Sequence, residues 1–143
     1  MQEDEKQGIT NNSVFKIIYF DRSRGEKLIH NALELKPILD EFQLNSYPES
    51  INLESPNGDL LTIAIGSEFG FIQYTCAQAN KPYLIAIDKT KRDKTDEFWE
   101  VDAGGTPTPI PAYACLPAGK IIEIVMYYLE HLDIPENIDW EAT

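Results

Sequence analysis

Two histidines, His30 and His131, are the side chains best suited to acid–base chemistry near neutral pH, since the ordinary pKa of histidine lies close to that range. A single histidine can work with a carboxylate, but His131 is predicted near the C-terminus of a helix. A histidine at that position more often interacts with the helix dipole or with solvent, and His30 has no stronger context. We therefore expect neither residue to be catalytic.

Zinc sites need closely spaced ligands, and this sequence has no Cys-x-x-Cys, no His-Glu-x-x-His and no His-x-Glu with a later Pro-Cys-x-x-Cys. Its two cysteines, Cys76 and Cys115, stand in apolar surroundings typical of buried free thiols. The expectation is a protein without metal, cofactor or disulfide framework, in a reducing compartment.

Two further motifs come close to catalytic patterns without matching them. Residues 117–120, Pro-Ala-Gly-Lys, would need glycine in place of Ala114 and serine or threonine in place of Ile121 to form a phosphate-binding loop. Residues 66–70, Gly-Ser-Glu-Phe-Gly, lack the Gly-x-Ser-x-Gly order of a nucleophile elbow. A helix start and a turn are the better interpretations, and we predict that the protein is not an enzyme.

Acidic residues are abundant, with 24 Asp and Glu against 12 Lys and Arg and a formal net charge of −12. Phosphate contacts require Lys and Arg, so direct nucleic-acid binding is not expected. Attraction to a basic protein partner is more plausible, although many soluble proteins are acidic for solubility alone. The predicted partner-binding residues flank an aromatic residue and a Gly-Gly turn, or lie in a second turn: Glu68, Asp96, Glu97, Trp99, Glu100 and Asp102.

These residues must be positioned by strands and turns. Alternating or continuous apolar runs predict strands at residues 14–20, 51–54, 60–65, 71–76, 83–87 and 98–101. Asn57-Gly58 between two of them is a strong hairpin signal, because both residues tolerate positive φ. Residues 26–32 are ambiguous, and residues 88–97 are expected to form an exposed charged loop.

Two helices are predicted from apolar residues at helical spacing. The first carries Leu35, Ile38, Leu39 and Phe42, with Pro37 in its first turn. The second begins at Pro117 and ends before Pro135, and it should be the main buried helix. The predicted fold is α+β: an antiparallel sheet of about five to six strands with two main helices packed on it.

The chain of 143 residues suits one domain. We expect residues 1–12 to be a flexible N-terminal lead and residues 13–143 to form the single domain. The sequence shows no signal peptide and no run of 18 apolar residues, so we expect a cytoplasmic protein that binds no membrane.

The last third of the chain resembles a known family. The order Trp99, Asp102, Gly104-Gly105, Pro111 and Pro117, followed by a helix with Tyr127-Tyr128 and then by Pro135 and Trp140, is similar to that of bacterial immunity proteins. Those proteins neutralise deaminase toxins of polymorphic-toxin and contact-dependent systems. The resemblance implies a non-catalytic antitoxin that binds its cognate toxin one to one and blocks the active site or substrate groove. The alternatives are a small ligand-binding or regulatory module with an apolar pocket lined by tyrosines, and a hydrolase or transferase that uses carboxylates alone.

Overall fold

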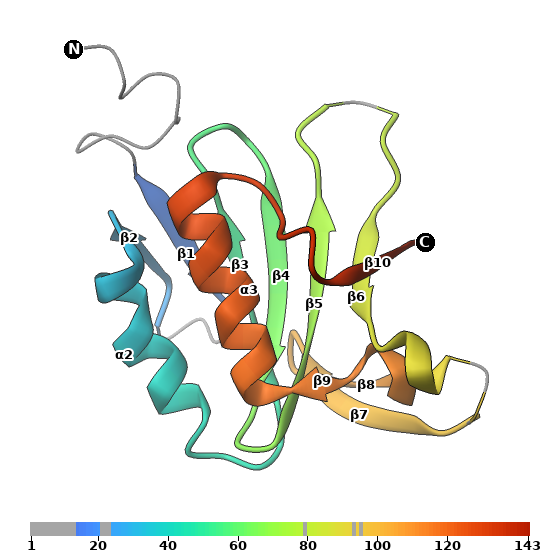
Figure 1. Cartoon of the computed structure of the whole chain (residues 1–143). Helices are drawn as coiled ribbons and strands as arrows, with labels where there is room; N and C mark the ends of the chain where they lie inside the picture. Colours follow the sequence, from blue (N-terminus) through green and yellow to red (C-terminus); the bar gives the residue numbers. More distant parts are fainter. Residues whose placement is uncertain (1–13, 21–23, 79, 93, 95) are drawn as a thin grey trace.

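A single sheet runs through the whole described chain, which in this computed structural model comprises residues 14–20, 24–78, 80–92, 94 and 96–143. The predicted lead at residues 1–12 lies outside these residues. Seven strands follow the order β10-β6-β5-β4-β3-β1-β2, while β7, β8 and β9 attach beside β3 and β5. Figure 1 shows both helices, α2 and α3, on the same face of this sheet.

The element bounds are β1 (Phe15–Tyr19), β2 (Glu26–Ile29), α2 (Ala32–Phe42), β3 (Glu49–Glu54), β4 (Leu60–Ile65), β5 (Phe69–Thr75), β6 (Leu84–Ile87), η1 (Lys89–Lys91), β7 (Phe98–Ala103), β8 (Thr106–Pro111), η2 (Ala112–Ala114), β9 (Leu116–Pro117), α3 (Ala118–His131) and β10 (Asp139–Ala142). The predicted α+β class with two helices is confirmed. The predicted number of strands is wrong, because the described residues form a sheet of ten strands.

Most of the strands missing from the prediction are short and lie at edges of the sheet. β2 has four residues and pairs only with β1, and β10 has four residues and pairs only with β6. Edge strands carry polar residues and lack the apolar runs of central strands, so their sequences show little strand signal. Trp140 lies in β10 and packs against the core.

Strand β8 carries Pro107, Pro109 and Pro111 and was not counted as a strand, although prolines so spaced predict an extended segment that is only partly paired in a sheet. All three lie at alternate positions, so the intervening Thr108 and Ile110 remain free to donate backbone hydrogen bonds to β7 on one side. β7 and β8 pair along their full lengths, from Phe98 opposite Pro111 to Ala103 opposite Thr106. The prolines therefore leave this hairpin intact and block further pairing along its outer edge.

The four predicted central strands are confirmed as consecutive antiparallel neighbours, β3 to β6. The turn between β3 and β4 contains Gly58 at φ +94°, and the backbone N–H of Ser55 donates to the carbonyl of Asp59 at 2.9 Å. The hairpin predicted by Asn57-Gly58 is therefore confirmed, with positive φ at Gly58 and not at Asn57.

Helix α2 begins after Asn31, whose side chain accepts a hydrogen bond from the backbone N–H of Glu34 at 3.0 Å. Because the helix starts at Ala32, Pro37 lies inside it and not in its first turn as predicted. Helix α3 starts after Pro117, and its last carbonyls are closed by Leu132 in the left-handed region at φ 54°.

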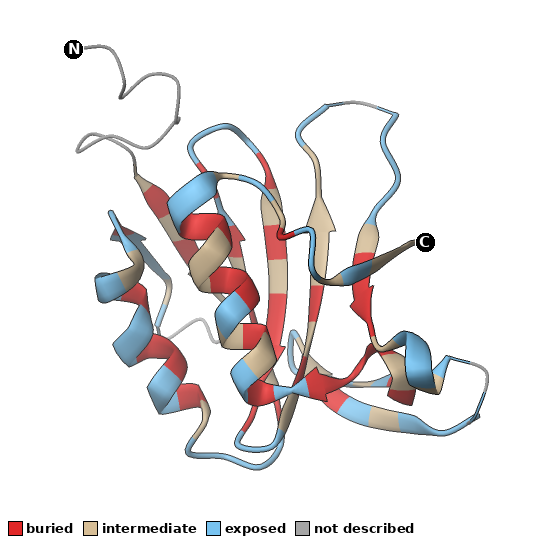
Figure 2. Cartoon of the chain, in the orientation of Figure 1, coloured by how far each residue is buried: buried red, intermediate tan, exposed pale blue. Residues whose placement is uncertain are grey.

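Two hydrophobic clusters lie on opposite faces of the sheet. The larger one fills the space between the sheet and the two helices, where α3 buries Ile121, Ile124, Val125, Tyr128 and Leu129. Figure 2 shows the buried stripe of each helix turned toward the strands. The smaller cluster includes residues from β4, β6, β7, β8 and η2, and the half-buried Trp99 packs against it. The β7–β8 hairpin is therefore anchored on the face of the sheet that the helices leave open.

Candidate functional site

Strand β7 divides three of the predicted partner-binding residues, Trp99, Glu100 and Asp102, between its two faces. Side chains alternate along a strand, and Trp99 and Val101 turn inward to the smaller cluster while Phe98 and Glu100 are exposed. Asp102 shares the outer face with Phe98 and Glu100 and is half-buried. The structure thus brings Glu100 and Asp102 together and places Trp99 behind them.

The indole ring of Trp99 packs edge-on against Phe69, with ring centroids 4.9 Å apart. The ammonium group of Lys91 lies 5.3 Å from the centre of the same ring, a distance at which cation–π attraction operates. Trp99 is half-buried by these contacts. Its position suits a support for β7 better than an exposed anchor.

Asp96, Glu97 and Glu68 lie outside β7 in exposed segments. The carbonyl of Glu97 accepts a hydrogen bond from the backbone N–H of Ala112 at 2.9 Å, which closes the start of the hairpin. The carbonyl of Glu68 accepts one from the N–H of Ala118 at 3.0 Å, and so satisfies a donor at the start of α3. The backbone carbonyls of Glu97 and Glu68 therefore stabilise the fold, and all three residues are exposed.

The outer face of β7 gains two residues that the sequence analysis missed, Tyr47 and Glu49. The Tyr47 hydroxyl donates to Oε1 of Glu100 at 3.1 Å, and Glu49 is the register partner of Asp102 in a short parallel pairing of β3 with β7. The backbone N–H of Asp102 also donates to the carbonyl of Pro48 at 2.7 Å. We call the set Tyr47, Glu49, Phe98, Glu100 and Asp102 the β7 surface.

Aromatic rings on this surface are unusually open to solvent. Phe98 is 62% exposed and Tyr47 is 43% exposed. Loss of solvation, together with the hydrogen bond to Glu100, raises the pKa of Tyr47 above its ordinary value, so its hydroxyl stays protonated and donates. Strand alternation, which places Phe98, Glu100 and Asp102 on one face, could be predicted from the sequence. No local sequence pattern predicts that Tyr47 and Glu49 lie beside them.

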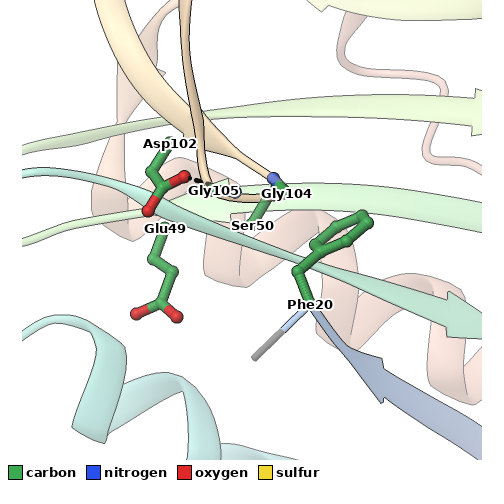
Figure 3. Close-up of a pocket in the computed structure, with 6 residues that line it drawn as sticks. All are labelled: Phe20, Glu49, Ser50, Asp102, Gly104 and Gly105. Carbon is green, nitrogen blue, oxygen red and sulfur yellow. Dashed lines mark hydrogen bonds between the residues drawn. The ribbon is translucent and has the colours of Figure 1, made fainter. Parts of the chain in front are cut away.

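A hollow of about 110 Å³ opens beside the β7 surface. Its lining residues come from β3, from the β7–β8 turn and from the residue after β1: Phe20, Glu49, Ser50, Asp102, Gly104 and Gly105. Figure 3 shows the carboxylates of Glu49 and Asp102 on one side of the hollow and the ring of Phe20 on the other. The hollow therefore combines negative charge with an aromatic wall.

A second carboxylate site, at the opposite end of β3, is buried and internally satisfied. Oδ2 of Asp59 accepts hydrogen bonds from the hydroxyls of Tyr128 at 2.7 Å and Tyr74 at 2.9 Å, and Oδ1 accepts one from the N–H of Ala77 at 2.9 Å. Burial, reinforced by the hydrogen bond to Asp59, raises the pKa of both tyrosines above the ordinary value. These two tyrosines belong to a structural network and line none of the hollows described here.

The histidines lie apart from both sites. Nδ1 of His30 is 3.3 Å from Oε1 of Glu34 at the start of α2, and the ring of His131 stacks on Tyr127 with centroids 4.0 Å apart. Among the described residues, no three His, Cys, Asp or Glu side chains are close enough to hold a metal ion. Across the same residues, no helix is long and apolar enough to span a membrane.

The described residues thus form a small α+β domain with a charged, aromatic surface beside a hollow. A family comparison identifies it more closely: residues 29–142 match the family described as Immunity protein Imm1, and the chain belongs to that family. The protein therefore has an immunity role, in which it binds a cognate toxin. No curated protein and no solved structure matches the chain.

Proposed function

We propose that this immunity protein neutralises a nucleic-acid-directed deaminase toxin by placing the β7 surface in the toxin's substrate groove. The observation that carries the proposal is the position of three acidic residues, Glu49, Glu100 and Asp102, on the paired strands β3 and β7, next to the exposed rings of Phe98 and Tyr47. The complex is one to one, and the protein itself turns over no substrate.

Charge complementarity supports this mode of inhibition. A toxin that binds nucleic acid needs Lys and Arg along its groove to contact phosphates. An inhibitor with a net charge of −12 is attracted to such a groove, and its carboxylates can take the place of the phosphates. Opposite charges accelerate encounter as well as stabilising the complex.

The exposed aromatic residues supply the apolar part of the contact. Binding energy in protein interfaces is concentrated in a few large side chains, often Tyr, Trp and Arg, that are surrounded by residues excluding water. Phe98 and Tyr47 flank Glu100 on one outer face. Their burial against the toxin would remove water from the carboxylates between them and strengthen the ion pairs that form there.

The deaminase class rests on the resemblance carried by the last third of the chain, from Trp99 to Trp140. Of the predicted contact residues, Glu100 and Asp102 belong to the β7 surface. Asp96, Glu97 and Glu68 extend the negative charge around it, and Trp99 supports the strand from behind. We place the protein in the cytoplasm, where a nucleic-acid-directed toxin acts.

Co-expression with the cognate toxin domain tests the proposal. Cells that produce both proteins should survive, and the two chains should copurify in equal amounts. A catalytically inactive toxin should copurify equally well, because binding needs no turnover. Toxicity without a complex would contradict the immunity role, and protection against a toxin that leaves nucleic acids and nucleotides unchanged would contradict the deaminase assignment.

A further inference from the structure

Residues that line the hollow beside the β7 surface are held in place by hydrogen bonds. Ser50, only 3% exposed, lines it, and its Oγ accepts a hydrogen bond from the N–H of Gly104 at 3.3 Å. Oδ1 of Asp102 accepts one from the N–H of Gly105 at 2.7 Å. The position of the Asp102 carboxylate is therefore fixed by the turn before any partner arrives (Figure 3).

Glycine is required where the turn meets the aromatic wall. Gly104 has φ +67°, and a Cβ atom at this position would stand 3.2 Å from the Phe20 ring. Any other residue would be strained in this conformation and would push against the ring. The absence of a side chain at Gly104 and Gly105 thus keeps the Phe20 ring close to the turn and keeps the space between ring and carboxylates open.

The chemistry of the lining selects a cation with a flat or compact head group. Two carboxylates, Glu49 and Asp102, attract positive charge, and the face of the Phe20 ring attracts a cation by its quadrupole. The volume of about 110 Å³ is well below the roughly 300 Å³ at which small-molecule pockets begin. A side-chain head group fits these limits, and a nucleotide or a whole metabolite does not.

We infer that this hollow is a socket for one arginine side chain of the toxin, an inference that rests on the proposed immunity function. Guanidinium presents a planar fork of donors that can bridge two carboxylates, and it stacks on aromatic rings. Ammonium is a compact point charge without a flat face. The socket therefore favours arginine over lysine, and it gives the β7 surface one specific anchor in addition to its general negative charge.

Two arginines of the chain itself are close in sequence to Phe20. Arg24 has its guanidinium carbon 5.3 Å and 5.2 Å from the ring centres of Tyr19 and Phe42, so it is engaged elsewhere. Arg22 lies outside the described residues.

The test compares dissociation constants for the complex of the full chain with a catalytically inactive toxin domain. Glu49→Gln keeps the shape of the socket and removes a charge, and Phe20→Leu removes the aromatic face. The matched control is Glu54→Gln, which neutralises an exposed carboxylate at the other end of the same strand. Because removing one member of a desolvated charge pair costs far more than removing a rim charge, Glu49→Gln should weaken binding about tenfold or more and Glu54→Gln less than about twofold.

Arginine-to-lysine and arginine-to-alanine variants of the toxin complete the test. For one toxin arginine, replacement by alanine should weaken binding much less when the immunity protein carries Glu49→Gln than when Glu49 is present. Replacement of the same arginine by lysine should preserve only part of the affinity. Equal effects of Glu49→Gln and Glu54→Gln on an otherwise tight complex would overturn the socket while leaving the immunity function intact. Failure of the unaltered protein to bind the toxin would instead refute the proposed function.

Discussion

The two ends of strand β3 carry carboxylates in opposite situations. At one end, the turn to β4 holds Asp59, which is 4% exposed and accepts three hydrogen bonds from Tyr74, Tyr128 and Ala77. At the other end, Glu49 stands beside Asp102 at an open hollow. The contrast distinguishes an acidic residue that stabilises the fold through hydrogen bonds from acidic residues that remain accessible to a partner.

The difference arises from the elements that meet each end. Tyr128 lies on α3 and Tyr74 on β5, so Asp59 ties the main helix and a neighbouring strand to the β3–β4 turn. At the Glu49 end, β3 meets β7 through one register pair, Glu49 with Asp102, and the glycine turn adds no side chains. Protein donors surround the first carboxylate, and solvent reaches the second.

Removal of the buried carboxylate should have the largest effect on stability. Asp59→Ala removes the acceptor of the Tyr74 hydroxyl and of the Ala77 N–H, and it leaves the Tyr128 hydroxyl only Ser55 Oγ, at 3.0 Å; the expected loss is about 3 kcal/mol of unfolding free energy. Chemical denaturation followed by circular dichroism measures it. Tyr74→Phe, which removes only one donor, should cost about 1 kcal/mol. If Asp59→Ala were as stable as Tyr74→Phe, the network would not hold the helix to the turn.

The same network predicts a loss of stability in alkaline solution. Burial and the hydrogen bond to Asp59 raise the pKa of Tyr128 above its ordinary value of 10.0. Its contribution to stability is therefore complete below about pH 10 and is lost as the pH rises from there toward the raised pKa. Between pH 10 and 11 the unfolding free energy should fall more steeply than in Tyr128→Phe, by up to about 1.4 kcal/mol per pH unit. Tyr83→Phe, at a tyrosine that is 50% exposed, is the matched control, and equal slopes for both variants would argue against the network.

Neutralising the open carboxylates should have the smallest effect on stability. Glu49→Gln and Glu100→Gln change side chains at the surface, where substitutions usually shift unfolding free energy by less than about 0.5 kcal/mol. Relief of repulsion between neighbouring carboxylates would make the change slightly favourable. A loss as large as that of Asp59→Ala would show that the Glu49 end of β3 is structural, and would remove the contrast between the two ends.

The sequence was sufficient for the centre of the fold and insufficient for its edges. Apolar runs predicted β3 to β6, and the periodicity after Pro117 predicted α3. β8 was not counted as a strand because its three prolines predict an extended segment only partly paired in a sheet, and their alternate spacing permits its pairing with β7. Short polar edge strands such as β2 carry little apolar signal of their own.

The candidate site was only partly within reach of sequence reasoning. Glu100 and Asp102 were selected because they stand near Trp99 and the Gly-Gly turn, yet strand alternation turns Trp99 to the opposite face. Tyr47 and Glu49 join the site through a parallel contact between residues far apart in the chain. Such a contact has no local pattern, so only the folded structure brings these residues together.

The measurement that tests the account most directly is the displacement of nucleic acid from the toxin. A fluorescent single-stranded oligonucleotide bound to a catalytically inactive toxin should be released as the immunity protein is added, with one equivalent sufficient. Because these three carboxylates would pair with basic side chains of the toxin, the variant Glu49→Gln/Glu100→Gln/Asp102→Asn should need well over about ten times more protein for the same release. If the complex formed while the oligonucleotide stayed bound, the β7 surface would not occupy the substrate groove, and the proposed mode of inhibition would be wrong.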